Sequence, residues 1–246
     1  MSIQSEADWR GLRRAADVAR ETLDALEQHV RVGITTGELD RVAAGIFARR
    51  GARSAPALIY GFPGTVLISV NDEIVHGVPG RRELQPGDLV KLDVTVERDG
   101  YIADAARSRV IEPAGEPATN LLACAVAAFE ASLAVARAGN RVNEIGKAVE
   151  REVRVRGFTV IRGLSGHGVG RTIHEPPTVH NHYVPSQARL EEGMVLTIEP
   201  LISAGSQEAV QGADGWTLRT ADGSLAAHHE HTLVITRGAP ILLTAA

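Results

Sequence analysis

Residues 84–93 read L-Q-P-G-D-L-V-K-L-D, and residues 190–199 read L-E-E-G-M-V-L-T-I-E. Each segment begins with leucine, has glycine at its fourth position, and continues into an apolar run that ends on a carboxylate, Asp93 or Glu199. The two segments lie 106 residues apart (190 − 84). Similar segments at a fixed spacing indicate an internal duplication. We therefore expect a fold with two related halves.

Two pairs of amphipathic helices precede these segments at the same spacing. Apolar residues recur every three or four positions, which predicts helices at about 7–30, 36–50, 118–138 and 143–156. Gly51 follows the first pair and Gly157 the second, again 106 residues apart (157 − 51). Helix pairs can resemble each other by chance, but the strands at the same spacing favour duplication. The prediction is one α/β domain, 1–246, with helix–helix–strand halves at about 7–112 and 113–240.

The composition sets limits on the kind of protein. The chain has 246 residues, 44% hydrophobic and 23% charged, which is enough for one large core or two small ones. A net charge of −4 and a pI near 6.1 give no basic footprint for nucleic acid. Neither a membrane-spanning run nor a secretory signal is recognisable. We expect a cytoplasmic protein, and the single cysteine, Cys124, rules out an intrachain disulfide framework.

The two carboxylates lie at matching positions of predicted strands. Strand alternation over 89–97 puts Lys91, Asp93 and Thr95 on one face and apolar side chains on the other. In 195–199, Glu199 likewise shares a face with Thr197. Acidic residues are depleted in strands, although a solvated outer face of a half-buried sheet would also explain them. The duplication favours a shared purpose, because a pseudo-twofold axis would bring both carboxylates together.

Each half carries a second acidic strand residue. Asp104 follows a predicted turn at Asp99-Gly100, and Glu230 enters the apolar run E-H-T-L-V-I. These two lie 126 residues apart (230 − 104), so about twenty residues are inserted, and the Gly- and Asp-rich stretch 204–224 predicts a long loop. Four converging carboxylates would repel one another without cations. With one or two imidazoles they suit a paired site for Mn, Co, Fe(II) or Zn.

Two histidines stand in an irregular glycine-rich segment. Residues 165–177 read S-G-H-G-V-G-R-T-I-H-E-P-P, with His167 and His174 seven positions apart. That spacing would fit one helix face, but three glycines and two prolines exclude a helix. A phosphate-binding loop is the alternative, which the absence of a lysine disfavours.

These segments, taken together, resemble the type I methionine aminopeptidases. The resemblance runs from the first helix to about Thr236 and rests on six motifs in order: V-N-D-E-I-V-H-G-V-P (70–79), L-D-V-T-V (92–96), G-H-G-V-G-R-T-I-H-E-P-P (166–177), T-I-E-P (197–200), D-G-W-T-L-R-T (214–220) and E-H-T-L-V-I (230–235). It implies the pita-bread fold, a pseudo-twofold arrangement with a central antiparallel sheet and outer helices.

The resemblance also implies a metal centre. Its two divalent ions, Co, Mn, Fe(II) or Zn, would be held by five residues: Asp93, Asp104, His167, Glu199 and Glu230. Asp104 and Glu230 would bridge the ions, with Asp93 completing one site and His167 and Glu199 the other. The sequence leaves the native metal open.

The implied reaction removes the N-terminal methionine of nascent polypeptides by attack of water on the first peptide bond. Glu199 would shuttle the proton, His174 would stabilise the developing oxyanion, and His76 would contact the amide nitrogen. The partners implied are the nascent N-terminal peptide and, transiently, the ribosome. A monomer is expected.

The sequence departs from the family around the site. Three alanines, Ala103, Ala105 and Ala106, replace the G-x-T-S residues that surround the family's second aspartate, and Leu67 and Ile173 replace a cysteine and a phenylalanine. The resemblance predicts a substrate pocket formed by Ile59, Tyr60, Phe62, Leu67, His76, Ile173, His174 and Trp216. Tyr60 stands where the family has histidine.

Two alternative functions stay open. The altered pocket is compatible with an aminopeptidase of the same fold that prefers another N-terminal residue, including a proline-directed one. A non-enzymatic metal-binding family member is the other alternative. In the run H-H-E-H, His229 and His231 are interpreted as structural, whereas the role of His228 is left open.

Overall fold

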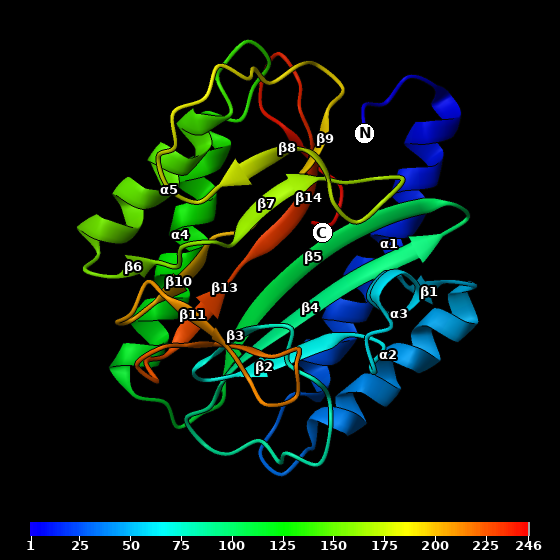
Figure 1. Ribbon diagram of the computed structural model, residues 1–246. Helices are drawn as coiled ribbons and strands as arrows, with labels where there is room; N and C mark the ends of the chain where they lie inside the picture. The colour runs from blue at the N-terminus through cyan, green and yellow to red at the C-terminus, as the bar shows by residue number, and fades with distance from the viewer. Residues whose placement is uncertain (246) are drawn as a thin grey trace.

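The computed structural model describes residues 1–245, and it contains five helices among them (Figure 1). Their bounds are α1 Glu6–His29, α2 Thr36–Arg50, α3 Ala55–Tyr60, α4 Glu116–Leu133 and α5 Asn143–Val155. The four long helices confirm the sequence prediction. None of the described helices combines the length and the apolar character needed to cross a membrane.

Two features of the helices differ from the prediction. Helix α4 ends at Leu133 rather than near residue 138. Just before this end, the hydroxyl of the buried Ser132 donates to the carbonyl of Phe129. A side-chain hydrogen bond of this kind competes with the helical ladder. The short helix α3 was not predicted. It is capped by the hydroxyl of Ser54 at one end and by Gly61, at φ +73°, at the other.

Within residues 1–245, fifteen strands form three sheets. Their bounds are β1 Arg53–Ser54, β2 Leu67–Val70, β3 Glu73–Val75, β4 Leu89–Arg98, β5 Tyr101–Val110, β6 Thr159–Val160, β7 Ser165–Gly168, β8 Glu175–His180, β9 Val195–Ile198, β10 Leu201–Ser203, β11 Ala209–Gln211, β12 Leu218–Thr220, β13 Ala226–His228, β14 Glu230–Val234 and β15 Ile241–Leu242.

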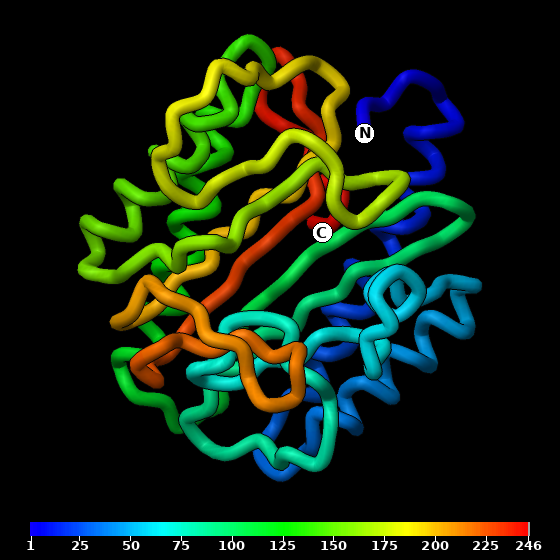
Figure 2. The backbone as a smooth tube through the Cα atoms, viewed as in Figure 1, coloured from blue at the N-terminus to red at the C-terminus, as the bar shows by residue number. Residues whose placement is uncertain are grey.

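The largest sheet runs through the centre of the molecule. It has nine strands in the order β1-β4-β5-β14-β9-β7-β8, with β2 beside β4 and β15 beside β14, and its pairs are antiparallel. Figure 2 shows β5 and β14 side by side, although more than a hundred residues separate them in sequence. The two halves of the chain therefore meet at this strand pair.

The four long helices cover one side of the central sheet (Figure 1). The apolar face of β4 packs against α1 and α2, where Val90, Leu92 and Val94 share a core with Leu23 and Leu39. The second helix pair, α4 and α5, covers the other half of the molecule (Figure 1). The strand alternation predicted for 89–97 is confirmed, but its polar face is also buried. That face is turned toward the interior site described below.

Equivalent backbone contacts recur in the two halves. The amide of Gly33 donates to the carbonyl of Leu84 at 2.9 Å, and 106 residues later the amide of Gly139 donates to the carbonyl of Leu190 at the same distance (139 − 33). Both glycines have positive φ. These contacts support the proposal of two repeat halves, about 7–112 and 113–240.

The stretch 204–224, expected as a long loop, instead contains a small β-hairpin. Strands β11 and β12 pair with each other, and β12 continues the pairing to β3. The guanidinium of Arg219 donates to Asp72 at 2.8 Å and to Glu73 at 2.7 Å, which ties the hairpin to the first half. The Gly- and Asp-rich composition belongs to its turns. The hairpin turn holds Trp216.

Candidate functional site

Five neighbouring strands of the central sheet supply the predicted ligands. Asp93 lies on β4, Asp104 on β5 and His167 on β7, while Glu199 directly follows β9 and Glu230 begins β14. In the strand register, Asp93 is opposite Ala106, which is in turn opposite Glu230. Residues directly opposite one another share a face of the sheet. The register therefore brings carboxylates from both halves together.

The side chains form two overlapping clusters. Potential ligand atoms of Asp104, His167 and Glu230 all lie within 4.8 Å of one another, as do those of Asp93, His228 and Glu230. Glu230 belongs to both clusters. The fifth predicted ligand lies beside them, because Nε2 of His167 is 3.4 Å from Oε1 of Glu199. The structure thus brings all five predicted ligands together and adds His228.

Burial makes this acidic cluster unfavourable on its own. Asp93, Glu199 and Glu230 are buried, and burial together with the charge of Asp104 raises the pKa of each carboxyl well above its usual value. Burial also raises the pKa of Asp104 to about 6. Oδ1 of Asp93 and Oε1 of Glu230 have no hydrogen-bond partner among the described residues. Buried acceptors without donors are costly, so bound cations would stabilise the site.

The donor set fits divalent transition-metal ions. Carboxylate and imidazole ligands suit Mn, Fe, Co and Zn. The two carboxylate oxygens without a hydrogen-bond partner are available to bind such ions. Hydroxyl and backbone groups orient the ligands. Nδ1 of His167 lies 2.9 Å from the carbonyl oxygen of Gly168, which leaves Nε2 directed at the cluster. Thr95 donates to Asp104 at 2.9 Å and Thr197 donates to Glu199 at 3.1 Å.

The structure resolves which of the three alanines near Asp104 matter for the site. Ala103 and Ala105 pack into apolar clusters on the helix-covered side. Ala106 alone lies in the row between Asp93 and Glu230. Only at position 106 does a missing hydroxyl concern the cluster itself.

A cavity of about 660 Å³ opens beside the acidic cluster. Seven of the eight predicted pocket residues line it: Tyr60, Phe62, Leu67, His76, Ile173, His174 and Trp216. Ile59 does not, and its side chain is 46% exposed. Pro56 and Tyr60, four residues apart on α3, share the face that lines the cavity, whereas the intervening Ile59 points elsewhere.

Two histidines stand between the cavity and the cluster. Nδ1 of His174 is 2.7 Å from the hydroxyl of Tyr60, and its ring lies 4.4 Å from that of His167. His76 has a φ of +60°, in the left-handed region that a non-glycine residue seldom adopts. Burial lowers the pKa of both histidines. Their neutral rings can accept or donate a hydrogen bond to a bound molecule.

The opposite wall is aromatic and apolar. Phe62 and Trp216 contact edge to face with 5.3 Å between their ring centres. Asp214 holds the turn that presents Trp216 by accepting from its amide at 2.9 Å. This wall offers apolar contact surface to a bound side chain.

Sequence reasoning missed several residues of the site. His228 is not among the predicted ligands, although its spacing of two from Glu230 is the strand period that puts both on one face. Its ring is buried beside the carboxylates, and burial lowers the pKa of His228 to about 3. This spacing was the only sequence signal for His228, and it does not by itself show that the ring joins the cluster. No comparable signal marks Pro56, Leu164 or Thr178, which also line the cavity.

The two histidines interpreted as structural, His229 and His231, lie away from the cluster and pack against Phe129 of α4.

Comparison with known proteins places the chain among related sequences and structures. Residues 10–237 match the model of metallopeptidase family M24. The chain is 39% identical to methionine aminopeptidase 2 of Bacillus subtilis, over 99% of both chains, and 40% identical to the methionine aminopeptidase of Clostridium perfringens, over 98% of both.

Solved structures agree. The methionine aminopeptidase of Rickettsia prowazekii superimposes with a TM-score of 0.94 at 33% identity, and that of Thermotoga maritima with 0.96 at 30%, each over the full length of both chains. A prolidase from Pyrococcus horikoshii shares the fold, with a TM-score of 0.80 at 21% identity over 99% of this chain and 63% of the prolidase. These matches confirm the predicted pita-bread fold class.

Proposed function

The chain belongs to metallopeptidase family M24, and from this premise we propose that it is a metal-dependent aminopeptidase that removes the N-terminal methionine of nascent polypeptides. One observation carries the proposal. Five buried predicted ligands from five neighbouring strands converge next to a partly apolar cavity that holds two further histidines. The similar proteins named methionine aminopeptidase support it.

We propose that Asp93, Asp104, His167, Glu199 and Glu230 hold two divalent ions, with Glu230 shared because it belongs to both ligand clusters. When bound, ions of this kind lower the pKa of water and polarise a peptide carbonyl group. Co, Mn, Fe(II) and Zn all suit the donor set.

The protein's own groups would position the substrate and move the proton. The carboxylate of Glu199, oriented by Thr197, would accept the proton of the attacking water and pass it to the departing amine. His174, held by Tyr60, would donate to the oxygen that becomes negative. His76, on the cavity wall, would contact the amide nitrogen of the scissile bond.

The cavity wall would receive the methionine side chain. Leu67, Ile173, Phe62 and Trp216 provide apolar surface there. We propose the cytoplasm as the compartment, transient contact with the ribosome, and a monomeric state. The bacterial relatives named methionine aminopeptidase support an N-terminal peptide as the substrate.

Peptide hydrolysis tests the proposal. Purified protein loaded with Mn, Co, Fe(II) or Zn should release methionine from a Met-Ala-Ser peptide. Glu199→Gln should lower kcat at least about 10²-fold, as expected when a general base is removed. Glu191→Gln, the same change at an exposed position of the same segment, should leave the rate unaltered. Absence of methionine release with every one of these ions would refute the proposal.

A second specificity has its own support. Leu67 and Ile173 alter the cavity wall relative to the family pattern, and one methylene in an apolar pocket is worth about 1–3 kcal/mol of discrimination. A panel of peptides that differ only in the first residue separates the two possibilities. Fastest cleavage after methionine supports the main proposal, whereas fastest cleavage after another residue supports an aminopeptidase with a different preference.

A further inference from the structure

His228 is the one histidine of the acidic cluster that the five-ligand set does not include. It is the last residue of β13 and lies two positions before Glu230. Its backbone is fixed to β5, because its amide donates to the hydroxyl of Ser108 at 3.0 Å and its carbonyl accepts from the same hydroxyl at 2.6 Å. The imidazole is 1% exposed. The ring therefore has a defined position inside the protein.

The imidazole has no hydrogen-bond partner within the described chain. Both Nδ1 and Nε2 are buried and unpaired. Nε2 is 3.6 Å from Oε2 of Glu230 and 3.9 Å from Oε2 of Glu199. These distances are too long for hydrogen bonds. A buried, unpaired imidazole destabilises a fold unless another group satisfies it.

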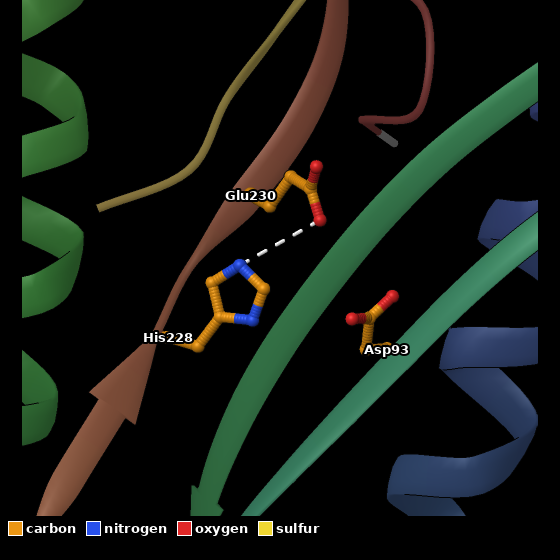
Figure 3. Close-up of side chains that lie close together, drawn as sticks. All are labelled: Asp93, His228 and Glu230. Carbon is orange, nitrogen blue, oxygen red and sulfur yellow. Dashed lines mark ion pairs between the residues drawn. The ribbon is translucent and has the colours of Figure 1, made fainter. Parts of the chain in front are cut away.

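The 3.6 Å separation from Glu230 is only slightly longer than that between two atoms that bind a common cation. Ligands about 2.0–2.2 Å from one metal ion lie roughly 3–3.5 Å from each other. Figure 3 shows the ring of His228 facing the carboxylate of Glu230. Asp93, on β4, lies across from both side chains. Potential ligand atoms of these three residues lie within 4.8 Å of one another.

We propose that His228 is a sixth protein ligand of the metal centre and binds the ion on the Asp93 side. The inference rests on the proposed two-metal function. One imidazole then serves each cluster, His167 with Asp104 and His228 with Asp93, while Glu230 belongs to both.

This assignment has a consequence for metal selectivity. An all-carboxylate position suits Mn or Mg, whereas an imidazole favours Fe, Co, Ni and Zn. His228 would therefore shift the ion on the Asp93 side toward Co and Zn relative to Mn.

Direct detection of the metal–nitrogen bond tests the proposal without relying on activity. The protein, labelled with ¹⁵N-histidine and loaded with ¹¹³Cd, is studied by NMR for one-bond ¹¹³Cd–¹⁵N coupling. Coupled ring nitrogens are expected on both His167 and His228. The His228 signal should disappear in His228→Gln and persist in His229→Gln, a matched change at the neighbouring position that faces α4.

The outcomes separate this inference from the function it rests on. Coupling at His167 without coupling at His228 overturns the sixth ligand and leaves the proposed function intact. Absence of coupling at both histidines contradicts the metal centre as well.

Calorimetric titration gives a second measurement. In His228→Gln, one of the two binding events for Co and Zn should weaken tenfold or more, and the Mn titration should change less. Unchanged Co and Zn affinity in a folded variant would contradict the assignment, and His229→Gln should bind like the unaltered protein.

Discussion

At the residue scale, Tyr60 shows how a departure from the family pattern can be accommodated. The phenol hydroxyl lies 2.7 Å from Nδ1 of His174, and their ring centres are 6.0 Å apart. If the hydroxyl donates to Nδ1, the proton of the neutral imidazole resides on Nε2. That tautomer gives His174 a donor for the substrate, so Tyr60 acts as a positioning residue.

The variant Tyr60→Phe removes this hydrogen bond and keeps the ring. Because such a bond is worth about 0.5–1.5 kcal/mol, kcat/KM for methionine release should fall about 2- to 12-fold with unchanged metal content. Steady-state kinetics and metal analysis check both parts. Tyr183→Phe, at a tyrosine that is also half exposed, is the control. Equal activity of Tyr60→Phe and the unaltered protein would remove Tyr60 from the positioning role.

At the element scale, close packing of α5 depends on a single glycine. A Cβ atom on Gly146 would overlap the carbonyl oxygens of His180 and His182, on and just after β8. Helix α5 therefore packs directly against this backbone. Helix propensity favours alanine at position 146, whereas packing against the backbone of β8 favours glycine.

The variant Gly146→Ala measures which demand is stronger. Alanine favours a helix over glycine by about 1 kcal/mol, but overpacking costs about 1–3 kcal/mol and more against immobile backbone. The free energy of unfolding should fall. Gly45→Ala in α2, where the new Cβ meets only the side chain of Arg49 at 3.5 Å, should instead raise it. Urea denaturation distinguishes the two, and a more stable Gly146→Ala would contradict the packing argument.

The turn between β4 and β5 is stabilised by an ionised side chain. Glu97 accepts from Arg53 at 2.7 Å and from the amide of Gly100 at 2.8 Å. Burial by itself would raise the pKa of Glu97, but these hydrogen bonds outweigh it and lower the pKa below its usual value. A lowered pKa in the folded state means that the ionised carboxylate stabilises the fold above the unfolded pKa, and that this contribution is lost as the pH falls through the folded value.

Glu97→Gln should accordingly lose stability only where Glu97 is ionised. We expect a loss of about 1 kcal/mol at pH 7, shrinking as the pH falls below about 4. Denaturation at pH 7 and at pH 3.5 provides the comparison, with the exposed Glu191→Gln as control. A difference that is equally large at both pH values would show that the charge is not responsible.

At the scale of the whole molecule, the proposed metal centre would join the two proposed halves. Asp93 and Asp104 come from the first half, and His167, Glu199 and Glu230 from the second. Ionised carboxylates there would repel one another without cations, so we expect metal binding to stabilise the assembled fold beyond its local effect.

Metal removal should therefore lower the melting temperature. A free metal concentration 100 times Kd adds about 2.7 kcal/mol, which corresponds to roughly 5–10 °C for a domain of this size. Scanning calorimetry with chelator and with Co or Mn measures the shift. A melting temperature that is the same in both conditions would contradict a metal site at the junction of the halves.

Asp93→Asn should change the melting temperature differently in chelator and in the presence of metal. One fewer buried carboxylate should raise the melting temperature in chelator, because repulsion is relieved. The same change should reduce the increase that metal produces. If Asp93→Asn destabilises the metal-free protein, repulsion between the carboxylates is not what limits the stability of that state.

Local periodicity predicted the long elements of this fold. The spacing of apolar residues located the four long helices, and alternation located β4 and the faces of its side chains. It did not predict the end of α4, because the hydrogen bond of Ser132 depends on burial, nor α3, which is too short to show a period. Composition predicts a loop in place of the hairpin β11–β12, because the pairing of this hairpin with β3 is non-local.

Because pairing between distant segments is not visible in the sequence, only part of the candidate site could be predicted. The sequence by itself determined the acidic residues, their place in strands and their family pattern, because each is a local property of the chain. Only the tertiary structure decided that β4, β5 and β14 align Asp93 with Glu230, that Tyr60 rather than Ile59 faces the cavity, and that His228 joins the cluster. Lateral strand register and side-chain burial arise from contacts between distant segments, which no local pattern encodes.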